Sequence, residues 1–164
     1  MADFKFEILE KMKKMTEQTD IKKEVFCYYL RGSQNYGLDD ESSDIDIVCV
    51  TVPSMRDLLF PKSYAPNFTV RTTEESNENL ITGMDLGDYI RKLFTGNYSI
   101  IESLFTPYVI VNEKYEYIWE QLKKNRFSFF KINPKKTYDS IVGQMKSYHN
   151  CAIRSGRASC RERV

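Results

Sequence analysis

Apolar side chains recur near the start of the chain with the spacing of one helical face. Phe4, Ile8, Met12 and Met15 form a stripe with Leu9 beside it, and lysines occupy the opposite face. Positions three and four apart lie on the same side of an α-helix. The pattern therefore predicts an amphipathic helix over residues 4–15.

Two apolar runs without helical spacing follow. Residues 25–30 (VFCYYL) lead into a Gly-Ser turn, and residues 45–52 (IDIVCVTV) are β-branched almost throughout and end at Pro53. Short apolar runs bounded by turn residues are typical of buried strands. Because the second run is apolar on both faces after Asp46, we expect it in the middle of a sheet. This favours an α/β or α+β domain over a helical bundle.

The remaining pattern predicts shorter elements. Residues 34–43 are polar and predict a loop. Asp85, with Asp88 three residues later, resembles a helix N-cap with an acidic first turn, and Gly96 should end that helix. We predict strands at 68–73, 80–84 and 108–111, and helices at 56–60, 86–94, 99–105, 115–122 and 137–154.

With 164 residues, 41% of them hydrophobic, the chain has the material for one core. We expect a core domain over residues 1–111, with helical elements packed on it over residues 112–154. Residues 155–164 (SGRASCRERV) have no apolar periodicity. We interpret them as a disordered or non-native tail.

The formal net charge is +1, but the charges are unevenly distributed. From residue 121 onward there are eleven Lys and Arg against two acids, which leaves 13 basic and 21 acidic residues before that point. A basic C-terminal part is compatible with a polyanionic partner such as an RNA or DNA end. A solvated helix face is the commoner meaning of such a pattern.

Cysteine usage and hydropathy indicate a reduced protein away from membranes. The four cysteines form no CxxC pair, and Cys27 and Cys49 lie inside apolar runs, where buried thiols are usual. The N-terminus is charged, and no stretch approaches the roughly 18 apolar residues of a membrane helix. We therefore expect a cytoplasmic protein without a membrane partner.

Candidate chemistry is concentrated in residues 31–52, where a Gly-Ser turn and a Ser-Asp-x-Asp sequence lie between two strands. Gly32 permits a sharp turn, and the following amides, with the Ser33 hydroxyl, could bind phosphate oxygens. Residues two apart on a strand share a face, so Asp44 and Asp46 should project side by side, about 7 Å apart. Turn chemistry explains each feature separately. Together they favour a metal site, because two carboxylates on one face repel unless a cation joins them.

The sequence RGSQNYGLDDESSDID, residues 31–46, resembles the Gly-Ser-x-x-x-Gly and Ser-Asp-x-Asp signature of the polymerase β-like nucleotidyltransferases. With Tyr36 and Gly37 it is similar to the family of predicted nucleotidyltransferases from bacteria and phages that carry a Gly-Ser-x-x-Tyr-Gly core. Residues 86–107 and 125–150 are similar to later segments of that family. The similarity thus covers roughly residues 25–150.

The resemblance implies a minimal nucleotidyltransferase fold, with a small mixed sheet flanked by helices. It implies transfer of a nucleoside monophosphate from ATP or another nucleoside triphosphate to a hydroxyl of a nucleic acid end, a small molecule or a protein. Two magnesium ions, or manganese, would bind Asp44 and Asp46. The nucleotide-binding residues would be Gly32, Ser33, Tyr36, Gly37 and Ser43.

The third carboxylate that the superfamily expects is not assigned by the sequence, and Glu78 and Asp85 are the candidates. Asn97 and Glu102 match family positions, although a helix cap and a buried hydrogen bond would explain them equally. His149, the sole histidine, is expected at the surface. Family members continue with further helices after that point, which leaves open that a substrate-side helical part is missing.

Two other functions remain open at this stage. A protein without a complete acid triad could be a catalytically incomplete module that binds a nucleotide or RNA. The chain could also be a nucleotidyltransferase partner of the toxin-antitoxin type, which acts through contact with a protein or by modifying one.

Overall fold

In a computed structural model, residues 2–36, 44–59, 67–74 and 77–155 are described. Five strands in these ranges form one mixed sheet in the order β3-β4-β2-β1-β5. The central strand β2 runs parallel to β4 and antiparallel to β1, and β3 and β5 are antiparallel edge strands. This confirms the mixed α/β fold. The strand bounds are Glu24–Arg31 (β1), Asp46–Val52 (β2), Phe68–Glu74 (β3), Asn77–Asp85 (β4) and Val109–Val111 (β5).

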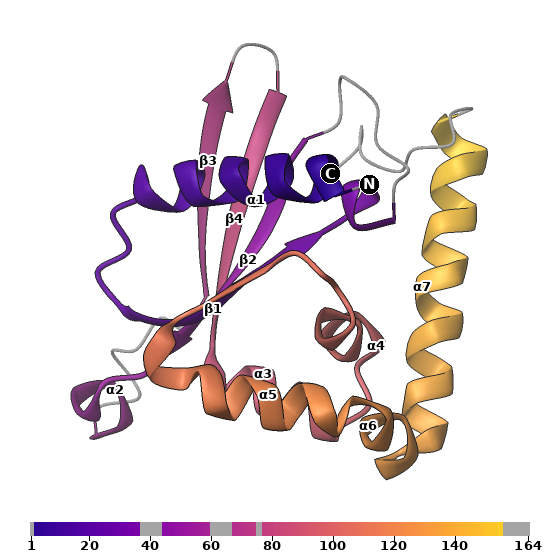
Figure 1. The fold of residues 1–164 in the computed structure, drawn as a ribbon. Helices are drawn as coiled ribbons and strands as arrows, with labels where there is room; N and C mark the ends of the chain where they lie inside the picture. Colours follow the sequence, from indigo (N-terminus) through magenta and orange to yellow (C-terminus); the bar gives the residue numbers. More distant parts are fainter. Residues whose placement is uncertain (1, 37–43, 60–66, 75–76, 156–164) are drawn as a thin grey trace.

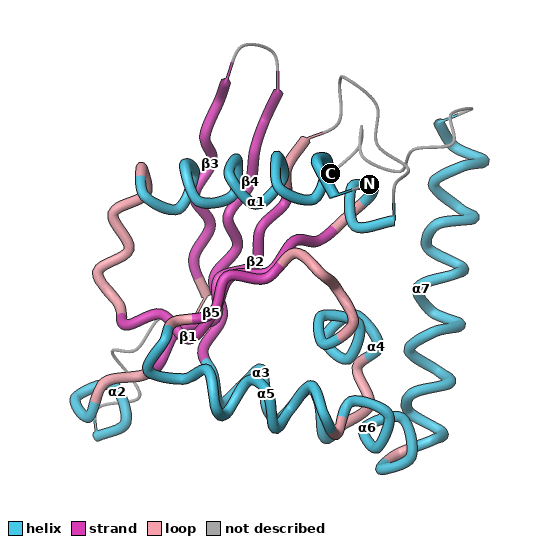
Figure 2. The backbone as a smooth tube through the Cα atoms, viewed as in Figure 1, coloured by secondary structure: helices cyan, strands magenta, loops and turns pink. Residues whose placement is uncertain are grey.

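Helices connect the strands and cover both faces of the sheet (Figures 1 and 2). The α-helices are Ala2–Glu17 (α1), Met55–Leu59 (α2), Leu86–Phe94 (α3), Tyr98–Ile101 (α4), Glu116–Lys124 (α5), Arg126–Ile132 (α6) and Pro134–Ser155 (α7). Short 3-10 helices span Ser33–Tyr36 (η1), Glu102–Leu104 (η3) and Glu113–Tyr115 (η4).

The two faces of the sheet contribute to different cores. On one face, Ile8 and Met12 of α1 pack against Ile47 of β2. On the other, Val48 and Val50 pack beneath helices α3 to α6. Figure 1 shows α1 on one side of the strands and α3 and α5 on the other. Alternate residues of β2 enter opposite cores, so the strand has to be apolar on both faces.

Helix α7 lies beside the other layers and contacts them through its first half (Figure 1). The Tyr98 backbone N–H donates to Ser140 Oγ at 3.0 Å. Gly96 has φ +77°, and a Cβ at this position would clash with Thr137 of α7. A glycine is therefore required both by the backbone conformation and by the close approach of the helix. Farther along α7, Tyr148 is exposed.

Two elements differ from the sequence prediction. Residues 126–132 form helix α6, which was not predicted because only Phe129 of its aromatic side chains is fully buried, so no helical stripe is visible. The beginning of the predicted 34–43 loop lies in the 3-10 helix η1. Residues 37–43 of that loop and residues 156–164 of the predicted tail lie outside the described residues.

The described helices after residue 111 share the core of the sheet. Trp119 and Phe129 belong to the same apolar cluster as Phe26 and Val50. The boundary between residues 1–111 and 112–154 remains a prediction. Within the described ranges, no helix combines the length and the apolar character needed to cross a membrane.

Candidate active site

The backbone around the two predicted metal ligands is fixed by neighbouring strand β4. The Ile45 N–H donates to the side-chain oxygen Asn79 Oδ1 at 2.9 Å, and the Ile45 carbonyl accepts the Leu80 N–H at 3.0 Å. Asn79 is buried. Since Ile45 separates Asp44 from Asp46, these two bonds hold the short acidic segment in line with β2. No sequence signal singled out Asn79.

The alternation of β2 places the two aspartates on one face. Ile45 and Ile47 belong to the core beneath α1, whereas Val48 belongs to the opposite core. Residues two apart share a face, so Asp44 and Asp46 point to the side of the sheet covered by α3 to α6. Both side chains are half-buried.

The Gly-Ser bend lies directly beside this pair. In the antiparallel register of β1 and β2, Arg31 is opposite Asp46, and Gly32 is the next residue. Gly32 has φ +94°, a conformation that favours glycine, and η1 begins at Ser33. The register therefore brings together residues that are more than ten positions apart in sequence. Gly37 and Ser43, the remaining predicted nucleotide-binding glycine and serine, lie outside the described residues.

The two candidates for a third acid lie at opposite ends of β4. Leu80 is opposite Asp46, so Glu78 is two residues away, at the end of β4 next to the acid pair. Asp85 is opposite Thr51 and lies five positions after Leu80, which is about 16 Å at about 3.3 Å per residue. Asp85 Oδ1 accepts the Asp88 N–H at 2.8 Å as the N-cap of α3. The cap explains Asp85, and its position separates it from Asp44 and Asp46.

The described side chains contain no group of three or more His, Cys, Asp or Glu that could hold a metal. The fit of magnesium to this site therefore rests on the pair Asp44 and Asp46. One or two carboxylates, completed by water and substrate phosphates, are a donor set that suits this ion. The chemistry of the pair is compatible with magnesium, and a third protein ligand would have to come from outside this set.

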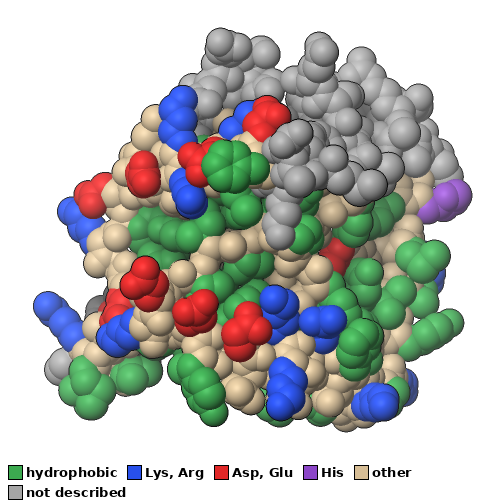
Figure 3. Space-filling view, viewed as in Figure 1, with side chains coloured by type: hydrophobic (Ala, Val, Ile, Leu, Met, Phe, Trp, Pro, Cys, Tyr) green, Lys and Arg blue, Asp and Glu red, His purple; other side chains and the backbone are tan. Residues whose placement is uncertain are grey.

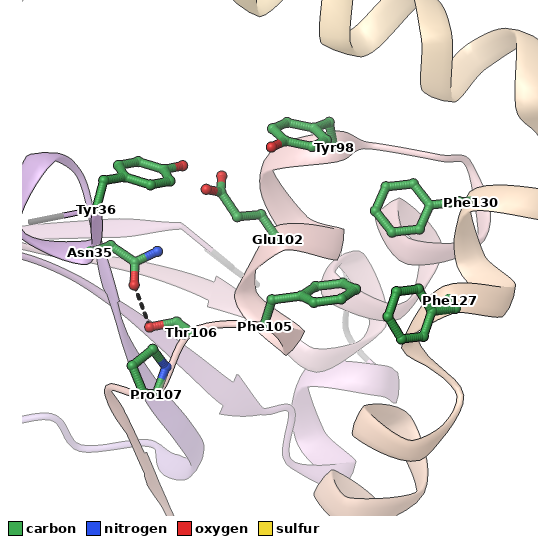
Figure 4. Close-up of a pocket in the computed structure, with 9 residues that line it drawn as sticks. All are labelled: Asn35, Tyr36, Tyr98, Glu102, Phe105, Thr106, Pro107, Phe127 and Phe130. Carbon is green, nitrogen blue, oxygen red and sulfur yellow. Dashed lines mark hydrogen bonds between the residues drawn. The ribbon is translucent and has the colours of Figure 1, made fainter.

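A cavity of about 420 Å³ opens next to the bend (Figure 4). Its polar lining includes Asn35 of η1, Glu102 of η3 and Thr106. Thr106 Oγ1 donates to Asn35 Oδ1 at 2.5 Å and accepts the Tyr108 N–H at 3.1 Å, which ties η1 to the segment before β5. Its aromatic lining is Tyr36, Tyr98, Phe105, Phe127 and Phe130. Tyr36, one of the residues predicted to contact the nucleotide, thus lines a pocket.

Glu102 is half-buried in this cavity, and its atom Oε1 is buried without a hydrogen-bond partner in the described part of the chain. Desolvation raises the pKa of the Glu102 carboxyl, while the positive charge of Arg31 acts in the opposite direction. At Oε1, therefore, the structure shows no buried hydrogen bond of the kind that would explain Glu102 without a ligand. The helix cap expected at Asn97 is confirmed, since Asn97 Oδ1 accepts the Ile100 N–H at 3.2 Å as the N-cap of α4.

The aromatic side of the cavity continues into a basic surface. The Arg126 guanidinium lies 5.0 Å from the Phe105 ring centre and 5.3 Å from that of Phe127. Lys123 and Lys131 lie in the last turns of α5 and α6. Figure 3 shows Lys and Arg side chains on the lower part of the face where Figure 1 has α5 and α6, with Asp and Glu side chains beside them. Part of the basic excess predicted after residue 121 thus lies beside the cavity.

Comparison with known families identifies the protein class. Residues 4–147 match the family described as RlaP, the RNA repair pathway DNA polymerase beta family. No curated protein matched the chain. The family match spans most of the 164 residues and includes the acid pair, the bend and the cavity. It confirms the polymerase β-like part of the resemblance, and the narrower Gly-Ser-x-x-Tyr-Gly family remains a prediction. The chain therefore belongs to the RNA repair pathway DNA polymerase beta family.

Proposed function

We propose that the protein transfers a nucleoside monophosphate from a nucleoside triphosphate to a hydroxyl group, with the end of an RNA as the preferred acceptor class. The single observation that carries this proposal is the strand register that sets Asp46 opposite Arg31, immediately before the Gly32 bend. An acid pair beside an amide-rich bend provides for both a cation and a triphosphate. The family description, which names RNA repair, supports the choice of acceptor.

Each residue has a separate proposed role. Asp44 and Asp46 would hold magnesium. The backbone amides after Gly32, with Ser33, would bind the β and γ phosphates. Bound magnesium would neutralise charge on the triphosphate and lower the pKa of the attacking hydroxyl. The protein's own contribution is positioning, because Asn79 and Leu80 fix the acid segment relative to the bend.

The chemistry is an in-line displacement at the α-phosphorus. The acceptor oxygen forms a bond to phosphorus and loses its proton to a base, the bond from the α-phosphorus to the bridging oxygen breaks, and pyrophosphate leaves. We propose Glu78 as the third acid of this site. Its position in β4, two residues before the partner of Asp46, supports this choice over Asp85.

Pyrophosphate release and transfer of labelled nucleotide test the proposal. Wild type is incubated with magnesium, each labelled nucleoside triphosphate and RNA, DNA or protein acceptors, beside Asp44→Asn. Asp85→Asn is the matched control, because it removes a carboxylate from the same sheet while asparagine keeps the helix cap. We expect transfer to RNA by wild type and by the control, and a large loss in Asp44→Asn. Equal transfer by all three proteins would remove the assigned role of the acid pair.

A second candidate is a nucleotide- or RNA-binding module without catalysis. The observation that favours it is that the described side chains contain no group of three or more potential metal ligands. In the same experiment, this candidate predicts protection of the protein by nucleotide without release of pyrophosphate.

A further inference from the structure

Glu102 presents an acceptor group without a partner inside an aromatic cavity. Its Oε1 atom is buried and has no hydrogen-bond partner in the described part of the chain. Figure 4 shows the carboxylate between Tyr36 and Tyr98, with Phe105, Phe127 and Phe130 farther into the cavity. A buried carboxylate oxygen without a donor is costly. A ligand that supplied N–H donors would remove this cost, once a rotation of the carboxylate brought the buried oxygen to the cavity.

We propose that this cavity binds a guanine base, whose Watson–Crick edge is recognised by Glu102. The inference rests on the proposed function, because it assigns the base preference of the same active site. The guanine could belong to an incoming nucleoside triphosphate or to the terminal nucleotide of an RNA acceptor. Both sources present the same chemical edge to the cavity.

The shape and lining of the cavity suit a planar base. Its volume of about 420 Å³ is within the usual range for a small-molecule site, roughly 300 to 1,000 Å³. Tyr36 and Phe127 are partly exposed, at 49% and 63%, so their rings are accessible for stacking. Bases stack on aromatic side chains with little dependence on sequence. The aromatic rings therefore account for the binding of a base in general. The selection of one base over the others must come from the polar groups.

Hydrogen-bond complementarity selects guanine. A carboxylate offers two acceptor oxygens side by side. Guanine presents two adjacent donors, the N1–H and the N2 amino group. Adenine and cytosine place a ring nitrogen acceptor beside their amino group, and uracil flanks its N3–H with two carbonyl oxygens. Each of these three bases would bring an acceptor toward the carboxylate, which is unfavourable.

Asn35 supplies the third complementary group. Its Oδ1 atom accepts the Thr106 hydroxyl at 2.5 Å, which orients the amide. Figure 4 shows the amide nitrogen of Asn35 turned away from Thr106, toward the Glu102 side of the cavity. An N–H donor at this place matches the O6 acceptor of guanine, which follows N1 along the same edge. The order of groups on the protein, two acceptors and then a donor, mirrors that of guanine.

Arg31 favours the ionised form of Glu102, which the recognition of guanine requires. Burial in the cavity disfavours the charged carboxylate, and the nearby guanidinium of Arg31 favours it. Arg31 also lies opposite Asp46 in the sheet. The same arginine therefore lies next to both the cavity and the acid pair. The base pocket and the proposed metal site are thus neighbouring parts of one active site.

Nucleotide binding without turnover tests the proposal. Equilibrium dialysis measures the Kd of the full chain for GTP, ITP, ATP, CTP and UTP. ITP lacks only the 2-amino group, so GTP should bind roughly tenfold or more tightly than ITP, the effect of one hydrogen bond to a charged acceptor. The RNA arm uses two short oligonucleotides that differ only in a 3′-terminal guanosine or adenosine. A guanine preference in either arm supports the pocket and identifies its source. Equal binding in both arms overturns the proposal.

Glu102→Gln provides the decisive variant. Glutamine has one acceptor and one donor, which match xanthine, where a carbonyl oxygen replaces the 2-amino group. The variant should lose the preference for GTP over ITP and gain affinity for xanthosine triphosphate. Glu113→Gln, an exposed glutamate of η4, is the matched control and should behave as wild type. A Glu102→Gln protein that retained the guanine preference would contradict the assignment.

The outcomes for the pocket and for the proposed function are separable. Asp44→Asn should abolish transfer and keep the guanine preference in binding, since Asp44 is not among the cavity residues. Guanine-selective binding without transfer from any nucleotide would support the pocket and contradict the nucleotidyltransferase. Equal binding and equal transfer for all four nucleotides would support the enzyme and overturn the pocket.

Discussion

The two ends of the parallel strand pair β2 and β4 both carry aspartates, but the surroundings of these side chains differ. At one end, Asp46 is opposite Leu80 and next to the strand that leads into the Gly32 bend. At the other, Asp85 is opposite Thr51, and its carboxylate accepts the Asp88 N–H in the first turn of α3. The far end is closed by a helix, whereas the near end adjoins a bend and a cavity.

This difference shows how an aspartate that stabilises the fold can be distinguished from one that is proposed to bind a metal. An aspartate at a strand end is favourable wherever a helix begins, because the N-terminal amides need acceptors. Asp85 satisfies that need, so its presence at this position requires no ligand. Asp46 is the first residue of β2, and Asp44 lies two residues before it, beside the Gly32 bend rather than at the start of a helix such as α3. The same residue type therefore has a fold-stabilising role at one end and a proposed catalytic role at the other.

The largest expected effect is on activity at the near end. Asp44→Asn and Asp46→Asn should each lower transfer by roughly 100-fold or more, since even outer-shell partners of a metal cost about 10- to 100-fold. The free energy of unfolding of each variant is measured beside transfer, so that a loss of chemistry is separated from a loss of folded protein. Steady-state transfer assays and urea unfolding measure the two quantities. Full activity in either variant would place the chemistry elsewhere.

The next effect is at the residue that positions the acids. Asn79→Ala leaves the buried Ile45 N–H without its acceptor and should lower the free energy of unfolding by about 1–3 kcal/mol. It should also reduce transfer at temperatures where the variant is folded, because the acid segment loses its anchor. Circular dichroism melts and assays at low temperature separate these changes. Lost stability with unchanged transfer would mean that the hydrogen bond does not position the acids.

A smaller effect is expected at the far end. Asp85→Ala removes the N-cap of α3 and should lower the free energy of unfolding by about 1 kcal/mol, with transfer unchanged. A change of this size shifts the melting temperature by about 2–4 °C in a domain of this length. Calorimetry measures the shift, and Asp85→Asn should restore most of it. Loss of transfer in the folded Asp85→Ala protein would make Asp85 a candidate for the third acid again.

The smallest effect concerns pH. Burial raises the pKa of Glu102 above its ordinary value of 4.5. A carboxyl with a raised folded-state pKa binds its proton more tightly in the folded protein, so its contribution to stability is greatest at low pH and is lost as the pH rises through the raised pKa. The stability of Glu102→Gln relative to wild type should therefore increase from about pH 4 to neutral pH. The free energies of unfolding of wild type and Glu102→Gln are measured by urea unfolding across this pH range. If they changed in parallel with pH, the raised pKa of Glu102 would be contradicted.

Local pattern predicted most elements, because their residues carry the periodicity of their own structure. The stripe of α1 and the doubly apolar strand β2 are confirmed, and so is the cap at Asp85. Helix α6 was missed because its rings line a cavity on one side and contact solvent on another, which removes the stripe. The sequence left a buried hydrogen bond and a functional role equally open for Glu102, and only the structure shows that its Oε1 atom is buried beside the cavity without a partner in the described part of the chain.

The sequence by itself determined the alternation that puts Asp44 and Asp46 on one face, since side-chain direction along a strand depends only on local geometry. It also determined that a glycine allows the sharp bend at position 32. Tertiary structure alone decided what these residues meet. Pairing of β1 with β2 brought the bend to the acids, pairing with β4 separated Asp85 from them, and the packing of α4 and α6 built an aromatic wall around Glu102. Such contacts depend on strand order and helix packing, which no local pattern encodes.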